Sequence, residues 1–182
     1  MKLKKYTQEE FDALPVVDGW KLCPSGDYSL IKSFGKGCRF GEYCSFGEGC
    51  SFGMGCSFGE RCRFGEWCIF GEECRFGERC SFGEECRFGE RCSFGEECRF
   101  GKECICEFGK FQKLATVGGF GSKARTTYFF LLDDGSVSVR CGCFAGTLEE
   151  WETKVKDTHG DSAFAKSYLL AGQAVRALWE IG

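Results

Sequence analysis

The stretch FGKGCR-FGEYCS-FGEGCS, residues 34–51, opens a run of twelve consecutive hexapeptides with the pattern Phe-Gly-x-x-Cys-x, which ends at Ile105. A fixed period is a stronger signal than any local propensity, because it specifies the architecture of the whole repeat. One hexapeptide is too short to bury its own Phe, whereas stacked coils bury all of them together. We therefore predict that residues 34–105 form a short parallel β-solenoid.

Phe and Cys lie two residues apart in the repeat, as in Cys62-Arg63-Phe64. Residues at that spacing in a strand point to the same face. We therefore predict that the Phe and Cys side chains fill the core and that residues such as Arg63 face outward. Glycine follows each Phe and is expected to allow the turn conformation that other residues resist. Two mostly polar turn residues complete each unit.

The outward residues predict three strands per coil. The residue before each Phe often alternates between Arg and Ser, so with three units per coil Arg75 lies between Ser57 and Ser93. Two or four units per coil would place Arg over Arg at about 4.8 Å, where like charges repel. In the turns, three units per coil place Glu73 over Arg91, and Arg79 over Glu97. Twelve units then give about four coils.

The unit Phe64-Gly65-Glu66-Trp67-Cys68-Ile69 resembles the hexapeptide repeat of left-handed parallel β-helices, and copies of it cover about 40% of the chain. Phe stands where that family usually has an aliphatic residue, and Cys stands where a small residue is usual. The resemblance implies a single-stranded, left-handed parallel β-helix with triangular coils. Many proteins of the family are trimeric acyltransferases that use coenzyme A or acyl carrier protein, with a His near the helix as general base.

Three other regions flank the repeat. Residues 1–33 are predicted to cap the first coil, with a capping box at Thr7-Gln-Glu-Glu10 that opens a short helix. Residues 106–125, which contain Gly118, Gly119 and Gly121, are predicted to be a flexible connector. Residues 126–182 are predicted to form a β-hairpin and two helices, a small β-β-α-α domain. The fold class is therefore mainly β, and the sequence leaves open whether this domain caps the helix or stands apart.

Sixteen cysteines would suggest a disulfide scaffold in a secreted protein. The basic start of the chain is not followed by an apolar stretch, so we expect no signal peptide and reduced thiols in the core. Disulfides between coils are the alternative, but parallel thiols in register suit the required dihedral poorly. Cys141-Gly-Cys143 could bind a metal or carry out redox chemistry. On the predicted strand, however, both side chains share one face, and a structural role is favoured.

Composition argues against two classes of partner. The formal net charge of −3 does not favour nucleic acid, and no apolar run approaches the roughly 20 residues that cross a membrane. One predicted column of the coils carries only Glu, which raises the alternative of an acidic nucleic-acid mimic, although nearby Arg residues offset the charge. That column contains Glu42, Glu60, Glu78 and Glu96.

Five outward positions break the repeat with large side chains, at Tyr43, Met54, Trp67, Ile69 and Ile105. Large apolar side chains on a charged surface often mark an interface. We predict that Trp67, Ile69, Tyr43 and Ile105 bind a partner, which includes a second copy in a homo-oligomer, either a dimer or a trimer. Cover by the N- or C-terminal segment of the same chain is the alternative.

The C-terminal region, with Arg140-Cys-Gly-Cys-Phe144 and Thr158-His-Gly-Asp161, resembles small uncharacterised proteins encoded by bacterial phages and prophages. This resemblance implies a location in the cytoplasm of a bacterial cell. We therefore expect a non-enzymatic binding protein that inhibits or sequesters a host factor, with a host protein or a small ligand as its partner. No catalytic residue, metal or cofactor is assigned. An acyltransferase relative is the main alternative, but the repeats lack His, and His159 is expected at a helix end.

Overall fold

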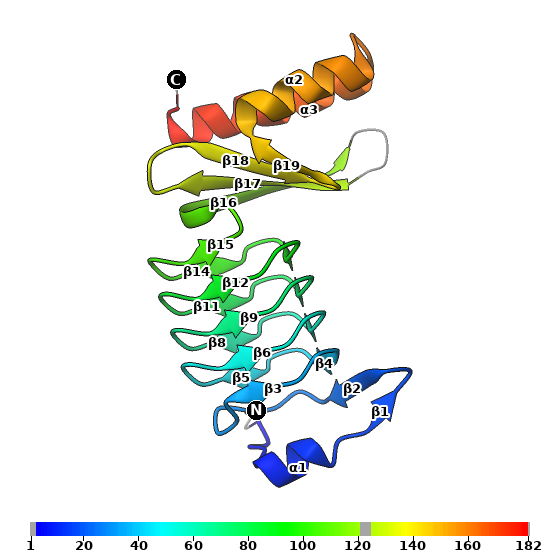
Figure 1. Ribbon diagram of the computed structural model, residues 1–182, viewed down its shortest axis with the longest axis vertical. Helices are drawn as coiled ribbons and strands as arrows, with labels where there is room; N and C mark the ends of the chain where they lie inside the picture. The colour runs from blue at the N-terminus through cyan, green and yellow to red at the C-terminus, as the bar shows by residue number, and fades with distance from the viewer. Residues whose placement is uncertain (1–2, 121–124, 182) are drawn as a thin grey trace. The chain divides into compact units, whose positions relative to one another are not determined.

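The computed structural model describes residues 3–120 and 125–181 (Figure 1). It divides into two compact units, Met1–Gly109 and Lys110–Gly182. The first unit contains the repeat, and the second contains an antiparallel sheet and two long helices. Each unit is described by itself below.

The repeat forms a three-sided parallel β-solenoid, in which each strand pairs with the strand three units further along the chain. Arg75 pairs with Ser57 on one side and with Ser93 on the other, so the predicted three strands per coil are confirmed. One side of the solenoid contains β4 (Cys38–Phe40), β7 (Ser57–Phe58), β10 (Arg75–Phe76) and β13 (Ser93–Phe94). The second contains β5 (Ser45–Phe46), β8 (Arg63–Phe64), β11 (Ser81–Phe82) and β14 (Arg99–Phe100). The third contains β3 (Ser33–Phe34), β6 (Ser51–Phe52), β9 (Ile69–Phe70), β12 (Arg87–Phe88) and β15 (Ile105–Cys106).

The solenoid has about five coils rather than four, because residues before the repeat form an additional one. Strand β2 (Trp20–Cys23) pairs in parallel with β4, and Asp27 bridges to Ser45. Cys23 and Tyr28 take the inward places that Phe occupies elsewhere, and the fully buried Tyr28 ring stacks on Phe46. The predicted cap, residues 1–33, therefore supplies a coil as well as a cap.

A short helix closes the N-terminal end of the core. Helix α1 (Gln8–Asp12) begins at the predicted capping box, in which Thr7 and Glu10 exchange hydrogen bonds between side chain and backbone. Phe11 on this helix meets Phe34 edge to face, at 5.2 Å between ring centroids. Strand β1 (Val16–Val17) then pairs antiparallel with β2. The aromatic end of the solenoid is thereby buried under Phe11 instead of facing water.

The core consists of Phe and Cys, as predicted. Along each side the rings stack, and Phe64 lies 4.9 Å from Phe82 with an interplanar angle of 4°. Between sides the rings meet edge to face, as Phe64 and Phe70 do at 5.0 Å and 88°. Both geometries are favourable for aromatic quadrupoles. Each ring is therefore held by vertical stacking and by lateral edge contacts at once.

The glycine after each Phe is required by the close approach of the coils, and this corrects the expected role in the turn conformation. Gly65 does not have a positive φ, but a Cβ on it would lie 2.5 Å from the backbone nitrogen of Glu48 in the preceding coil. The positive φ occurs two residues later, at +57° for Trp67. There the backbone N–H of Trp67 points along the solenoid axis and donates to the carbonyl of Glu84, at 2.9 Å.

The second unit contains four antiparallel strands followed by two helices. The strands are β16 (Gly109–Phe120), β17 (Arg125–Leu132), β18 (Val137–Cys141) and β19 (Phe144–Thr147), paired in chain order. The helices are α2 (Leu148–His159) and α3 (Ala163–Trp179). They pack on the sheet around Phe129 and Trp151, whose rings meet edge to face at 5.3 Å. Thr147 and Ser162 are the N-caps of the two helices.

Two predictions for this unit need correction. Most of the predicted connector, 106–125, is strand β16, which pairs with β17 from Phe111 onward; pairing between distant segments overrides local glycine content. The predicted strand that carries Cys141 and Cys143 is split by a turn at Gly142, where φ is +63°. Cys141 ends β18 and Cys143 lies in the turn, so the two cysteines do not share the face of one strand.

Replacing Phe64 by Ala tests the aromatic core. The change removes a buried ring that has stacking and edge contacts, and we expect the free energy of unfolding to fall by about 3–5 kcal/mol. Urea denaturation measures the loss, with Ser81→Ala on the outer surface as a control that should change it by less than about 0.5 kcal/mol. A loss below about 1 kcal/mol for Phe64→Ala would place the ring outside the core.

Replacing Gly65 by Ala tests the close approach of the coils. We expect the free energy of unfolding to fall by about 2 kcal/mol or more, because the added Cβ collides with backbone that cannot move without separating two coils. The neighbouring Glu66→Ala is the matched control, with an expected change below about 0.5 kcal/mol. A neutral Gly65→Ala variant would contradict the steric role, since the φ of Gly65 does not require glycine.

Candidate functional site

Trp67 and Ile69 form an exposed apolar pair on one side of the solenoid. Trp67 lies in the turn that leads into β9, and Ile69 is the first residue of that strand. Their side chains are 49% and 51% exposed. Within the described part of Met1–Gly109 no segment buries them, so the alternative of intrachain cover does not hold for this unit. We call these two residues the β9 patch.

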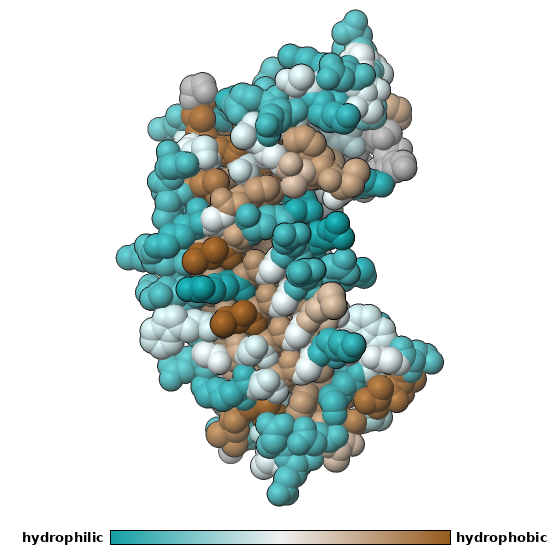
Figure 2. Space-filling view, in the orientation of Figure 1, coloured by the Kyte–Doolittle hydropathy of each residue, from teal (hydrophilic) through white to brown (hydrophobic). Residues whose placement is uncertain are grey.

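The apolar character continues along the same side. The outward residues of this side form the column Ser51, Ile69, Arg87 and Ile105, as the strand register shows. Ile105 is partly buried and is separated from Ile69 by Arg87. On the face of the coils seen in Figure 2, hydrophobic surface accordingly alternates with hydrophilic surface. The structure thus places three of the four predicted binding residues on one side, with Ile105 as an outlying member.

Tyr43 lies elsewhere, so the four predicted residues do not form one site. It occupies the turn between β4 and β5, at a different corner of the coil. The Arg61 guanidinium of the next coil lies over its ring, 5.5 Å from the centroid, and donates to the Tyr43 hydroxyl. This contact between coils accounts for an aromatic residue at position 43, and we do not include Tyr43 in the β9 patch.

The backbone at Trp67 would favour a smaller residue. A left-handed conformation costs a residue with a Cβ about 1–2 kcal/mol, and Trp67 has a φ of +57°. Glycine occupies the equivalent turn position in the preceding coil, at Gly49, and Glu occupies it in the following one, at Glu85. Neither packing nor backbone geometry therefore calls for a large aromatic side chain at this turn.

The charged turns form ladders rather than a field of one sign. Arg79 pairs with Glu97 at 2.9 Å and Arg91 with Glu73 at 3.5 Å, as the three-sided register predicts. The hydrogen bond from Arg79 lowers the pKa of Glu97. Residues 34–105 contain 13 Glu and 10 Lys or Arg, so the acidic columns are largely neutralised. Exposed pairs of this kind add little stability.

The cysteines of the repeat are buried core residues. The Cys62 thiol donates to the carbonyl of Gly41 in the preceding coil at 3.4 Å, and the same contact recurs along the repeat. Contacts with neighbouring thiols, together with burial, raise the pKa of Cys62. Burial raises the pKa of Cys106 to about 11. Among the described residues, no group of three or more His, Cys, Asp or Glu is placed to hold a metal ion.

The structure brings His159 close to the Cys141-Gly-Cys143 motif of the second unit. Cys141, Cys143 and His159 all line one cavity of about 240 Å³. The Thr127 hydroxyl donates to the Cys141 thiol at 3.2 Å, and Cys143 is exposed. The sequence gives no signal for this proximity, because it depends on how α2 packs across the turn between β18 and β19.

A family model described as an RNA-binding, Nab2-type zinc finger matches four overlapping stretches, residues 56–71, 67–83, 73–89 and 85–101. Together they cover about a quarter of the chain. These stretches contain no histidine, and their cysteines face the core of the solenoid. The similarity therefore follows the spacing of the repeat and does not assign the chain to that family. No curated protein and no solved structure shows significant similarity to the chain.

Among the described residues, no helix could span a membrane. Neither α2 nor α3 combines the length and the apolar character that a helix needs to cross a bilayer.

Thiol labelling tests the placement of the cysteines. In the folded, reduced protein, thirteen of the sixteen thiols are buried, Cys98 and Cys141 are half-buried and Cys143 is exposed. We expect a thiol reagent such as Ellman's reagent to react rapidly with Cys143, more slowly with the two half-buried thiols, and with the remainder only after unfolding. Cys143→Ser should abolish the fast phase. Rapid native reaction of most thiols would contradict the solenoid core.

Proposed function

We propose that the protein is a non-enzymatic binding protein, in which the coils provide a rigid scaffold and the β9 patch contacts a partner protein. The observation that carries this proposal is the exposure of Trp67 and Ile69, two residues apart, at coil positions that Glu, Arg, Ser or Gly occupies in most other units. Trp is enriched among the residues that dominate binding energy at interfaces. Two such side chains, half exposed and adjacent, suit the centre of a contact with another protein.

The position of Trp67 in the repeat supports a role in binding. The same left-handed turn conformation is held elsewhere by Arg or Glu, as at Arg61 and Glu85, so the conformation does not explain an aromatic side chain at residue 67. A departure from the repeat that the solenoid does not explain is expected where function needs it. The same argument does not apply to Tyr43, since its contact with Arg61 joins two coils.

The scaffold suits this role because it presents the patch in a fixed geometry. Ile69 is held in register with Ser51 and Arg87 on either side, and the backbone of Trp67 is hydrogen-bonded to Glu84 of the next coil. A preorganised surface loses less conformational entropy on binding than a flexible loop. The partner therefore meets a docking surface that is already ordered.

We base the proposed partner on the two resemblances of the sequence, that of the tail and that of the repeat. The tail's resemblance to phage and prophage proteins supports the bacterial cytoplasm as the setting, and inhibition or sequestration of a host protein as the activity. A second copy of the chain, in a dimer or trimer, is the other partner to test. The resemblance of the repeat to left-handed hexapeptide proteins keeps an acyltransferase as the alternative, which would require loss of activity on His159→Ala.

Trp67→Glu tests the proposal. Glu occupies the same turn position at residue 85, so the variant should fold with nearly unchanged stability. We expect it to weaken partner binding by at least about tenfold, because an anchoring aromatic is replaced by a charge. Light scattering measures self-association, and capture from a bacterial lysate followed by mass spectrometry detects a host protein.

Tyr43→Glu is the matched control, since it changes an exposed aromatic residue in the same kind of turn at another corner. An oligomeric parent that becomes monomeric only with Trp67→Glu would identify the partner as a second copy. A monomeric parent that captures a protein lost only with Trp67→Glu would identify a host partner. Equal behaviour of the parent and both variants in the two assays would contradict the proposal.

A further inference from the structure

The cavity of the second unit is formed by segments that are distant in the sequence. Arg125 begins β17, Cys141 ends β18, and Cys143 lies in the turn before β19. Helix α2 supplies one wall, from Trp151 to His159, and Tyr168 of α3 completes it. The cavity lies wholly within Lys110–Gly182 and is independent of the β9 patch. Its volume, about 240 Å³, lies just below the range of about 300–1,000 Å³ that is usual for drug-sized ligands, so it suits a single ring rather than a nucleotide.

The charge of the cavity lining is one-sided. It includes Arg125, Lys154 and the protonatable His159, but no Asp or Glu. Neither Arg125 nor Lys154 forms an ion pair with any residue that the structure describes. This contrasts with the formal net charge of the chain, which is −3. Two uncompensated cations beside a cavity favour an anionic ligand.

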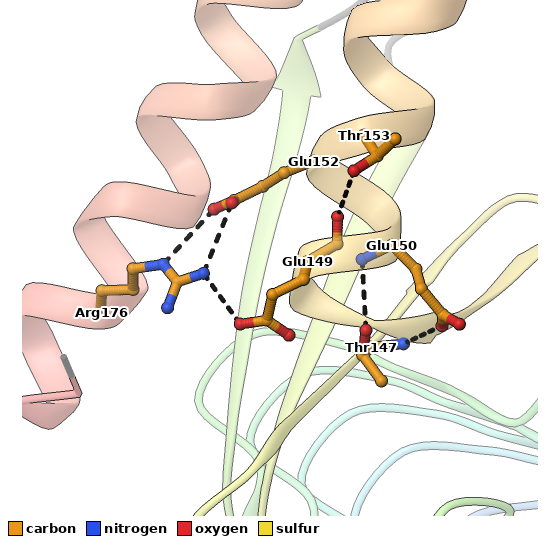
Figure 3. Close-up of polar contacts among 6 residues, drawn as sticks. All are labelled: Thr147, Glu149, Glu150, Glu152, Thr153 and Arg176. Carbon is orange, nitrogen blue, oxygen red and sulfur yellow. Dashed lines mark hydrogen bonds and ion pairs between the residues drawn. The ribbon is translucent and has the colours of Figure 1, made fainter.

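Helix α2 keeps its carboxylates away from this cavity. Glu149 and Glu152 both accept hydrogen bonds from Arg176 of α3, at 3.0 Å and 3.4 Å, and Glu150 reaches back to the backbone N–H of Thr147 (Figure 3). None of these three carboxylates lines the cavity. These three acidic side chains are therefore occupied elsewhere, whereas Lys154 of the same helix lines the cavity.

The remaining walls are aromatic. Phe144, Trp151 and Tyr168 contribute to the lining, and the His159 ring stacks on Tyr168 with centroids 5.6 Å apart. The side chain of Trp151 is also fixed by edge contacts with Phe129 and Tyr168. The cavity thus combines a preformed aromatic wall with cations, an arrangement that suits a planar apolar body bearing an acidic group.

A glycine allows Arg125 to approach the turn beside the cavity. Gly142 has a φ of +63°, and a Cβ on it would overlap the Arg125 guanidinium. The same turn places Cys143 in the lining. The structure therefore gives each residue of Cys141-Gly-Cys143 a place at the cavity. Gly142 leaves room for the Arg125 guanidinium, and the two cysteines line the cavity.

We propose that this cavity binds a small aromatic carboxylate, with the carboxylate between Arg125 and Lys154 and the ring against Phe144 and Trp151. Arg matches the planar carboxylate with paired donors, and Lys adds a point charge. The aromatic wall supplies the apolar contact. The segments that contain Cys141 and His159 both line this cavity.

Benzoate is the probe, and benzyl alcohol is its neutral counterpart with the same ring. Titration of the full-length protein, followed by NMR, should show binding of benzoate at least about tenfold tighter than that of benzyl alcohol, because only the carboxylate meets the cations. Bound benzoate should also slow the labelling of Cys143, which lines the cavity. Equal affinity for the two compounds, or binding of neither, would overturn the proposal.

Matched lysine variants locate the site. Lys154→Met removes a lining cation, whereas Lys156→Met changes an exposed lysine of the same helix that does not line the cavity. We expect the affinity for benzoate to fall about three- to tenfold with Lys154→Met and to stay unchanged with Lys156→Met. Gly142→Val, which displaces Arg125, should have an effect at least as large, with folding checked by circular dichroism. An equal effect of the two lysine changes would place binding elsewhere. All of these variants leave Trp67 unchanged, so their outcome is separate from that of the β9 patch.

Discussion

The distance between successive coils is the constraint on which the rest of the first unit depends. Parallel strands hydrogen-bond at about 4.8 Å, and the Phe rings stack at nearly that separation, with 4.9 Å between Phe64 and Phe82. Aromatic stacking and backbone pairing therefore require the same repeat along the axis. At this spacing the backbone after each ring lies so close to the coil below that only a glycine fits, as at Gly65. Phe and Gly therefore act together in each unit. The stacked Phe rings match the spacing between coils, and the glycine allows the backbones to approach to that distance.

The same spacing determines which side chains are neighbours on the outer surface of the solenoid. Each outward residue lies directly over its counterpart in the next coil, so charges form ladders such as Arg79 with Glu97. A large apolar residue in such a column gains little from its vertical neighbours, since Ile69 lies between Ser51 and Arg87. Departures from the repeat at outward positions are therefore not explained by the solenoid. Tyr43 is the exception, because Arg61 gives it a partner within the ladder.

The sequence predicts most of the first unit and less of the second, for a physical reason. Identical units impose identical neighbours, so periodicity alone identifies the core, and the Arg and Ser alternation identifies three sides. The first coil was missed because Tyr28 and Cys23 occupy Phe positions without the surrounding motif. The role of the glycine after each Phe differs from the prediction, because it depends on a steric contact with another coil. Such a contact leaves no pattern in the neighbouring sequence. In the second unit, β16 and the cavity depend on pairing and packing between distant segments, which no period or motif encodes.

The chemistry of the core also follows from its narrow cross-section. Three rings per coil leave room only for small side chains between them, and a thiol fills that space while its proton bonds a glycine carbonyl, as Cys62 does with Gly41. A thiolate in the same place would have no positive partner and would face a carbonyl oxygen. The core thiols are also closed off from solvent, and Cys62 is fully buried. Because a reagent must reach the sulfur to react with it, the packing that makes cysteine suitable for the core also makes it unreactive there. Chemical reactivity is left to Cys143, the one cysteine in the described structure that lies on the surface, beside the cationic cavity of the second unit.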